Sequence, residues 1–239
     1  MALRTPGFLA DQVMKSAHAA TLVRRRDLGH GLIELVLGSD DFREATILPG
    51  DSTAFRTSRT EFRHYTPARI DAASGELSII VHRHGSGPGE ELILSWHEGD
   101  PVAVCQWGSK KSFRWEDGDE PVLVVGDATV ISLAMAFGDR CRAEGRPFQA
   151  LLEVDPGDVE ATGELVPQAA VVARSGAHGL DAEAWLQRHA EQLDASTTVY
   201  LAGHGQSIQR QRRVLLDLTP IDRRSIRTQP YWADGKTGL

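Results

Sequence analysis

The chain has 239 residues and a formal net charge of −7, with 41% hydrophobic and 25% charged residues. This balance is ordinary for a folded protein and excludes a disordered chain, while the acidic excess argues against a general nucleic-acid binder. No apolar run approaches the roughly 20 residues that cross a bilayer, and the N-terminus lacks a continuous apolar stretch of signal-peptide length. We therefore expect a cytoplasmic protein that does not insert into membranes.

The two cysteines, Cys105 and Cys141, are isolated and form no CxxC pair. An iron–sulfur cluster held by thiolates normally needs four cysteines, so one chain cannot supply it. We expect both cysteines to be small core residues, which suits a reducing compartment.

The first half of the chain is expected to form short strands with glycine-containing connections, a pattern that favours a small antiparallel β-barrel. The stretch Asp71-Ala-Ala-Ser-Gly75 is typical of a hairpin turn in which Gly75 supplies a positive φ. The strands are expected at residues 19–26, 31–37, 52–57, 62–70, 77–82 and 101–106.

The second half changes character after a polar, glycine-containing stretch at residues 116–120. The run Pro121-Val-Leu-Val-Val-Gly126 is typical of a strand buried on both faces of a parallel sheet. Alternating strands and helices favour a doubly wound α/β domain. We expect an α+β two-domain protein, with a β-barrel at residues 1–117 and an α/β domain at 118–239. Strands are expected at 121–126, 148–154, 169–174 and 197–202, and helices at 90–96, 130–143, 180–193 and 207–218.

Arg63 and Tyr65 are the first residues that point to chemistry. Residues two apart on a strand share one face, so the pair places an aromatic ring beside a cation. A flavin needs both, because it has a flat ring system and a phosphate tail. The alternative is an exposed arginine and tyrosine with no ligand.

The segment from Val81 to Gly89 is a glycine-rich loop between a strand and a helix. Backbone N–H groups at a helix start can hold pyrophosphate, and glycines permit close approach. A flexible turn is the alternative.

Two strands of the second half end in candidate nucleotide-binding positions. Gly126, Asp127 and Thr129 end one, without a GxGxxG fingerprint, and a helix cap is the alternative. Gly203 ends another and is followed by a helix that carries Arg210, which either meets a 2′-phosphate or faces solvent. Arg174, at the end of a third strand, is a comparable phosphate ligand.

Together these motifs resemble the siderophore-interacting, ferric-siderophore reductase family of the ferredoxin-reductase-like superfamily. The string Arg63-His-Tyr-Thr-Pro-Ala-Arg-Ile-Asp71 is similar to R-x-Y-T-x-R-R-x-D, with Ala68 in place of an arginine. His84-Gly85, Gly87 and Pro88 match H-G-x-G-P-A-S, with Glu90 in place of the serine. Asp127 and Thr129 match G-D-E-T, with Ala128 in place of the acidic residue. The Tyr231-Trp232 pair and Gly235 match the family's G-Y-W-R-x-G ending, with Pro230 and Ala233 as departures.

The resemblance implies FAD and either NADPH or NADH as cofactors. By that likeness Tyr65 stacks on the isoalloxazine, Thr66 hydrogen-bonds near the ring or ribityl chain, and Arg63 holds phosphate. The full set of cofactor-binding residues it implies is Arg63, Tyr65, Thr66, His82, His84, Gly85, Gly87, Pro88, Gly126, Asp127, Thr129, Arg174, Gly203 and Trp232. Lys110, Lys111 and Lys236 are the residues expected to attract an anionic ferric substrate.

Glu90 is the departure with the largest physical consequence. A carboxylate at that position repels pyrophosphate by up to about 1 kcal/mol when solvated. Either Glu90 points away from the phosphate, or the flavin binds differently.

The resemblance implies a flavin-dependent NAD(P)H oxidoreductase that reduces a ferric siderophore, or another ferric chelate, and releases Fe(II). It needs no catalytic side chain. No resident metal is expected, because His82 and His84 share a strand face without an evident third ligand. The alternatives are a binding or regulatory module with a degenerate flavin site, and a reductase with another acceptor such as free flavin, a quinone or a partner protein. We expect a monomer.

Overall fold

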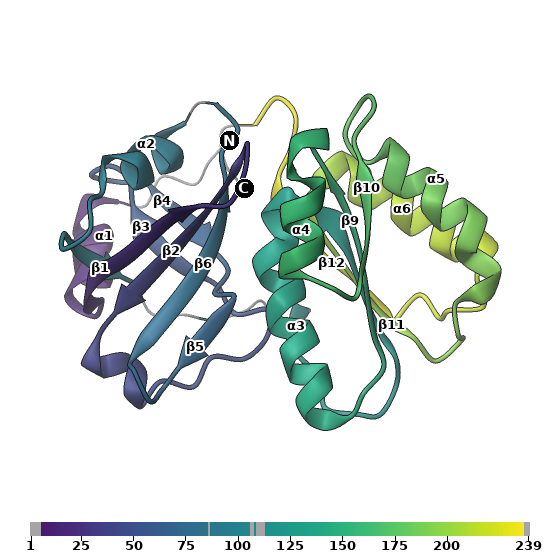
Figure 1. The fold of residues 1–239 in the computed structure, drawn as a ribbon, viewed down its shortest axis with the longest axis horizontal. Helices are drawn as coiled ribbons and strands as arrows, with labels where there is room; N and C mark the ends of the chain where they lie inside the picture. Colours follow the sequence, from purple (N-terminus) through teal and green to yellow (C-terminus); the bar gives the residue numbers. More distant parts are fainter. Residues whose placement is uncertain (1–5, 86, 106–107, 109–112, 237–239) are drawn as a thin grey trace.

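The computed structural model describes residues 6–85, 87–105, 108 and 113–236, and these form two domains in chain order (Figure 1). The N-terminal domain is built on antiparallel strands and the C-terminal domain on a parallel sheet with helices on both faces. The two-domain fold class expected from the sequence is confirmed. The exact boundary at residues 117 and 118 stays a prediction. Among the described residues, no helix is both long and apolar enough to cross a membrane.

The N-terminal domain has a five-stranded sheet in the order β5-β6-β2-β1-β7 and a separate β3-β4 hairpin. Its elements are α1 (Gly7–Lys15), β1 (His18–Asp27), β2 (Leu32–Gly38), η1 (Asp40–Arg43), β3 (Thr53–Arg56), β4 (Phe62–Tyr65), β5 (Arg69–Asp71), β6 (Glu76–His82), α2 (Pro88–Ser95) and β7 (Pro101–Val104). The turn before β6 contains Gly75 at φ +73°, as its sequence predicted.

The expected barrel is open on one side. Where the chain leaves β7, Cys105 N donates to Ala54 O at 3.1 Å, which joins the hairpin to the main sheet. Between β4 and β5, no strand pairing is present among the described residues. The single strand expected at 62–70 is divided there, because Pro67 has no N–H and interrupts the ladder.

The C-terminal sheet is fully parallel in the order β10-β9-β8-β11-β12. Its elements are β8 (Val122–Asp127), η3 (Ala128–Val130), α3 (Ile131–Glu144), β9 (Phe148–Val154), η4 (Pro156–Asp158), α4 (Val159–Leu165), β10 (Ala169–Ala173), α5 (Leu180–His189), η5 (Ala190–Gln192), β11 (Thr198–His204), α6 (Gly205–Leu218) and β12 (Ile226–Trp232). Helices α3 and α4 cover the face toward the N-terminal domain, and α5 and α6 cover the other (Figure 1).

Strand β8 explains why its sequence is apolar throughout. Val122 and Val124 pack into the core on the α3 side, while Leu123 and Val125 pack into the core on the α5–α6 side. Alternate side chains of a strand point to opposite faces, so a central parallel strand needs apolar residues at every position.

The two domains share a core. Leu32, Ala68 and Ile80 of the N-terminal domain belong to the same buried cluster as the side chains of α3. At its centre, Ile80 N donates to Ser132 Oγ at 2.8 Å. Buried apolar contact of this kind fixes the two domains against each other and positions the residues at their boundary.

Candidate functional site

Arg63 and Tyr65 lie on β4 and turn toward the first turn of α2. A Cβ placed on Gly89 would lie 2.6 Å from Tyr65 Oη and 3.1 Å from Arg63 Cγ, so both side chains contact this backbone. The Tyr65 ring packs on Phe55 at a centroid distance of 5.3 Å and remains partly exposed. Burial raises the pKa of Tyr65 to about 12, with Arg63 lowering it and Glu90 raising it. The ring is therefore neutral at physiological pH.

Thr66 connects this strand to the C-terminal domain. Its side chain is buried, and its Oγ1 lies 3.2 Å from the hydroxyl of Tyr231 on β12. Burial raises the pKa of Tyr231 to about 12, while the Thr66 contact lowers it. The contact brings the segment from Arg63 to Thr66 next to Tyr231 and Trp232 near the end of the chain.

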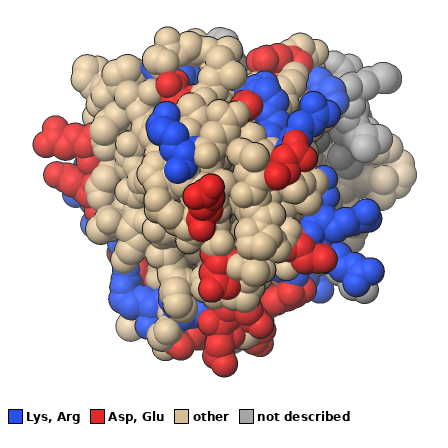
Figure 2. Space-filling model, turned by 90° about the vertical axis from the view of Figure 1, so that its right-hand side faces the viewer, with Lys and Arg blue, Asp and Glu red and all other residues tan. Residues whose placement is uncertain are grey.

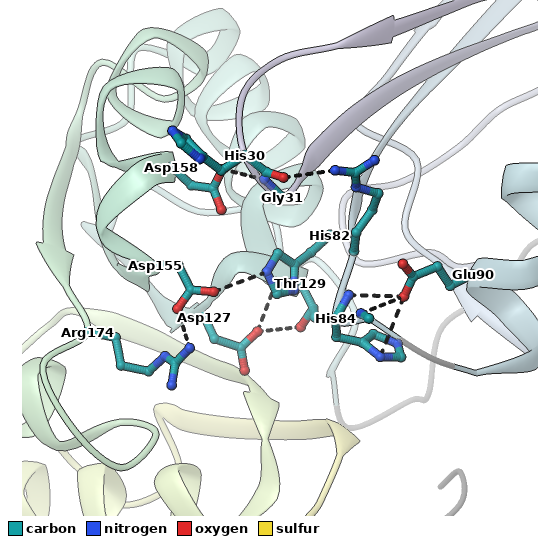
Figure 3. A network of polar contacts seen from close by, with 12 residues as sticks. His30, Gly31, His82, His84, Glu90, Asp127, Thr129, Asp155, Asp158 and Arg174 are labelled. Atoms are coloured by element: carbon teal, nitrogen blue, oxygen red, sulfur yellow. Dashed lines mark hydrogen bonds and ion pairs between the residues drawn. The ribbon is translucent and has the colours of Figure 1, made fainter.

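The glycine-rich loop has the geometry expected from its sequence, but its amides already have an acceptor. Gly85 and Gly87 adopt φ values of +90° and +135°, and Pro88 begins α2 directly afterwards. Glu90 Oε2 accepts from His84 N at 3.1 Å and Gly85 N at 3.0 Å, and lies 3.7 Å from His84 Nδ1 (Figure 3). The Glu90 carboxylate thus points into the loop and occupies the amide groups that would hold a phosphate.

Asp127, at the end of β8, forms a hydrogen-bonding hub at the carboxyl edge of the parallel sheet. Its Oδ1 accepts from Thr129 N at 2.9 Å, which is the helix cap that the sequence left as an alternative. Its Oδ2 accepts from His204 N at 2.8 Å and from Trp232 Nε1 at 3.0 Å. The hub therefore ties together the ends of β8, β11 and β12.

Gly203 is required by this hub. It has φ +92°, and a Cβ there would lie 2.5 Å from Asp127 Oδ2. The sheet order places Gly126 and Asp127 beside Gly203 where the winding of the sheet reverses, between β8 and β11. Ligands of open α/β sheets bind at this switch point.

An aromatic and imidazole cluster lies over the switch point; sequence reasoning included its Trp232 among the cofactor-binding residues but assigned no ligand role to its histidines. The Trp232 indole stacks on His204 at 4.4 Å, and His178 meets Trp232 edge-on at 4.8 Å. Burial lowers the pKa of His178, with Arg174 also lowering it. Motif spacing gave no signal for the cluster, because the two histidines lie 26 positions apart in the sequence.

The remaining sequence-predicted residues lie in other surroundings. His82 points across the domain boundary toward Asp155, with Nε2 3.9 Å from Oδ2, rather than into the glycine-rich loop. Arg174 pairs with Asp155. Lys236 is exposed near the end of the chain, and Lys110 and Lys111 fall outside the described residues.

The positive charge of Arg210 on α6 is balanced by a neighbouring acidic side chain. Arg210 on α6 pairs with Glu183 of α5 at 3.1 Å. Figure 2 shows this side of the molecule, where lysine and arginine side chains lie among acidic ones and form no continuous basic surface.

Comparison with known proteins finds a family model and solved structures that resemble this chain. Residues 120–235 match the family model described as siderophore-interacting protein. The C-terminal domain is thus similar in sequence to siderophore-interacting proteins. The family resemblance predicted from the sequence is confirmed by this match. No curated protein sequence matches the chain.

Solved structures of similar fold cover both domains of this chain. The siderophore-interacting protein of Acinetobacter baumannii has a TM-score of 0.74 at 15% identity, covering 92% of this chain and 91% of its own. A siderophore utilization protein from T. fusca has a TM-score of 0.67 at 20% identity, covering 93% and 95%. Phthalate dioxygenase reductase, described as transferring electrons from pyridine nucleotides to [2Fe-2S], has a TM-score of 0.72 at 16% identity, covering 93% of this chain and 70% of its own. At these identities the likeness shows that the chain shares the two-domain fold of these proteins, and nothing more.

Proposed function

We propose that this protein is a flavin-dependent NAD(P)H oxidoreductase that reduces a ferric siderophore, or a similar ferric chelate, and releases Fe(II). The observation that carries the proposal is the 3.2 Å contact between Thr66 and Tyr231. It joins the Arg63–Tyr65 strand of the N-terminal domain to the carboxyl edge of the parallel sheet. A flavin on the first surface and a nicotinamide on the second would lie next to each other, as electron transfer between them requires.

The residues present fit the ring of FAD better than its phosphates. Tyr65 is a neutral, partly exposed aromatic surface beside the Arg63 cation, and this suits a flat ring with a charged tail. The amides of His84 and Gly85, which would hold the pyrophosphate, are bonded to Glu90. FAD binding therefore requires Glu90 to leave the loop, and this lowers the affinity.

The nicotinamide nucleotide is assigned to the switch point between β8 and β11. Gly126 and Gly203 allow the strand ends to pack closely there, Asp127 orients the neighbouring backbone, and Trp232 donates to Asp127 at the same edge. Arg174 lies at the end of β10 and is the candidate for the nucleotide phosphate, for which it would exchange its contact with Asp155.

A flavin held beside Tyr65 and Arg63 would supply the redox chemistry that links a two-electron donor, NAD(P)H, to one-electron reduction of ferric iron. The protein contributes the positions of the two ring systems and excludes water between them. Fe(II) is softer and less highly charged than Fe(III), so it is held less tightly by the oxygen ligands of the chelator. Lys236, together with Lys110 and Lys111, is the proposed source of attraction for the anionic chelate.

The test is a titration of the purified full-length protein with FAD, followed by anaerobic addition of NADPH or NADH. We expect the flavin absorbance to appear with the protein and to bleach on reduction. Later addition of a ferric chelate should restore the absorbance and yield Fe(II), detected with a ferrous-specific dye. A colourless protein that takes up no added FAD would reject the proposal.

A binding or regulatory module is the second candidate, and the Glu90 contacts with His84 and Gly85 are the observation that favours it. In that case the internal carboxylate substitutes permanently for the cofactor phosphate. Binding of a ferric chelate without reduction, in the presence of FAD and NADPH, would support this candidate over the reductase. Turnover with free flavin or a quinone, but not with ferric chelates, would support a reductase with a different acceptor.

A further inference from the structure

Three potential metal ligands from both domains meet at the domain boundary. His82 ends β6 of the N-terminal domain, whereas Asp155 and Asp158 lie just after β9 of the C-terminal domain. One ligand atom from each of the three lies within 4.8 Å of the other two. The sequence gave His82 no third ligand, because the two aspartates lie more than 70 positions further along the chain. Figure 3 shows the three side chains converging between the domains.

Each aspartate has one oxygen fixed by the protein. Asp155 Oδ1 pairs with Arg174, and Asp155 Oδ2 faces His82 Nε2 at 3.9 Å. Asp158 Oδ1 accepts from Gly31 N at 2.8 Å. Ligands oriented by such secondary hydrogen bonds are typical of metal sites in proteins.

Asp158 Oδ2 provides an observation independent of the clustering. Asp158 is 1% exposed, and its Oδ2 is fully buried without a hydrogen-bond partner. A buried carboxylate oxygen without a partner is costly, so it calls for a cation or another donor. A Cβ on Gly31 would lie 2.8 Å from this oxygen and 3.4 Å from His82 Nε2, which places the two atoms over the same glycine.

The surroundings of His82 influence whether its imidazole is protonated. Burial lowers the pKa of His82, although Asp127, Asp155 and Asp158 act in the opposite direction. A neutral imidazole offers a lone pair to a metal, while a protonated one does not.

We propose that His82, Asp155 and Asp158 form a binding site for one divalent first-row transition ion, of the Zn²⁺ or Mn²⁺ class, that bridges the two domains. One imidazole with two carboxylates suits these ions, whereas Ca²⁺ and Mg²⁺ favour sites made only of oxygen ligands. Metal–ligand bonds of about 2.1 Å place tetrahedral ligands roughly 3.4 Å apart, so the three side chains must close by about 1 Å. Metal binding can be tested in the absence of flavin and nicotinamide nucleotide, when Arg174 keeps its contact with Asp155.

Asp158→Asn is the sharpest variant. The amide oxygen can still accept from Gly31 N, while an NH₂ group replaces the unpartnered oxygen. Asp100→Asn is the matched control, because Asp100 also pairs with a histidine, His97 at 3.6 Å, at an exposed position. The full-length protein, stripped with a chelator, is titrated with ZnCl₂ by calorimetry, and its thermal midpoint is measured with and without Zn²⁺.

We expect the wild type and Asp100→Asn to bind Zn²⁺ at one saturable site. We expect Asp158→Asn to bind Zn²⁺ at least about tenfold more weakly. Zn²⁺ should raise the thermal midpoint of the first two proteins and leave that of Asp158→Asn unchanged. Excess Mg²⁺ should not displace the ion. If Asp158→Asn does not fold, Asp155→Asn, at a more exposed position, provides the same comparison. Equal Zn²⁺ affinity in the wild type and the variant, or no saturable binding to the wild type, would overturn the proposal.

Discussion

At the residue scale, the position of one carboxylate decides how the glycine-rich loop behaves. Glu90 accepts from two loop amides, so it both stabilises the loop and competes with any phosphate for the same donors. The negative charge adds electrostatic repulsion to this competition. The Glu90 carboxylate thus occupies, within the protein itself, the place of the phosphate that the loop was expected to bind.

Replacing Glu90 by glutamine tests this competition. Glu90→Gln removes the charge and keeps an oxygen that accepts from the loop. We expect the dissociation constant for FAD to fall by about fivefold, because repulsion of up to roughly 1 kcal/mol is removed. Glu91→Gln, on the exposed side of the same helix turn, is the control and should change nothing. Flavin fluorescence quenching measures both, and an unchanged affinity in Glu90→Gln would show that the loop is not the phosphate site.

Gly203 offers a second test at this scale. Gly203→Ala brings a methyl group to within 2.5 Å of Asp127 Oδ2 at a φ of +92°, so the hub must open. We expect a loss of about 1–3 kcal/mol in the free energy of unfolding, with denaturation in urea as the measurement. Gly145→Ala is the control for the positive φ alone, because Gly145 has φ +68° and nothing within 4 Å of the added carbon. A loss no larger than that of the control would argue against the collision with Asp127.

At the scale of elements, the apolar strands were predictable and the chain ends were not. The β8 run is buried on both faces, so its pattern is visible without a structure. Strand β12 was missed because Pro230 lies within it, and proline is tolerated only because this strand is at the sheet edge. Helix α1 was also missed; it carries apolar residues, but Phe8, Leu9 and Val13 are exposed and only Ala10 is buried.

For the candidate site, too, some features were visible in the local sequence and others were not. Local strings such as Arg63-His-Tyr-Thr66 and the glycine-rich loop could be found from spacing alone. The Asp127 hub depends on the strand order of the parallel sheet. The Thr66–Tyr231 contact and the partners of His82 depend on the domain interface. No local pattern contains that information.

Ser132 links two elements across the interface and provides a test of their coupling. Ser132→Ala leaves the buried Ile80 N–H without its acceptor. We expect the free energy of unfolding to fall by about 1–3 kcal/mol, with an unchanged dependence on denaturant concentration. Ser95→Ala, which removes an exposed hydroxyl at the end of α2, is the control and should be near neutral. Equal stability of the two variants would contradict a buried bond between Ile80 and Ser132.

At the scale of the whole molecule, burial of the tyrosines gives a prediction about pH. The chain has three tyrosines, and burial raises the pKa of each, to about 12 for Tyr65 and Tyr231. Tyrosines of the unfolded chain ionise near pH 10, so the folded protein holds these protons to higher pH. The stabilisation is fully present below about pH 10 and is lost as the pH rises toward 12.

Tyrosinate absorbance and circular dichroism, recorded together during an alkaline titration, check this. We expect little ionisation near pH 10 and a steep rise that coincides with unfolding. A tyrosine that ionises near its ordinary pKa while the circular dichroism remains native would contradict the burial of that side chain.

The proposed function requires electron transfer between cofactors on the two domains, which their shared core holds against each other. The most direct measurement is the amount of Fe(II) formed per NAD(P)H consumed by the FAD-supplemented protein, without oxygen, with a ferric siderophore as acceptor. The account predicts two ferrous ions per nucleotide, with no turnover when FAD is omitted from flavin-free protein. Nucleotide oxidation that is absent, or that proceeds equally well without FAD, would contradict it.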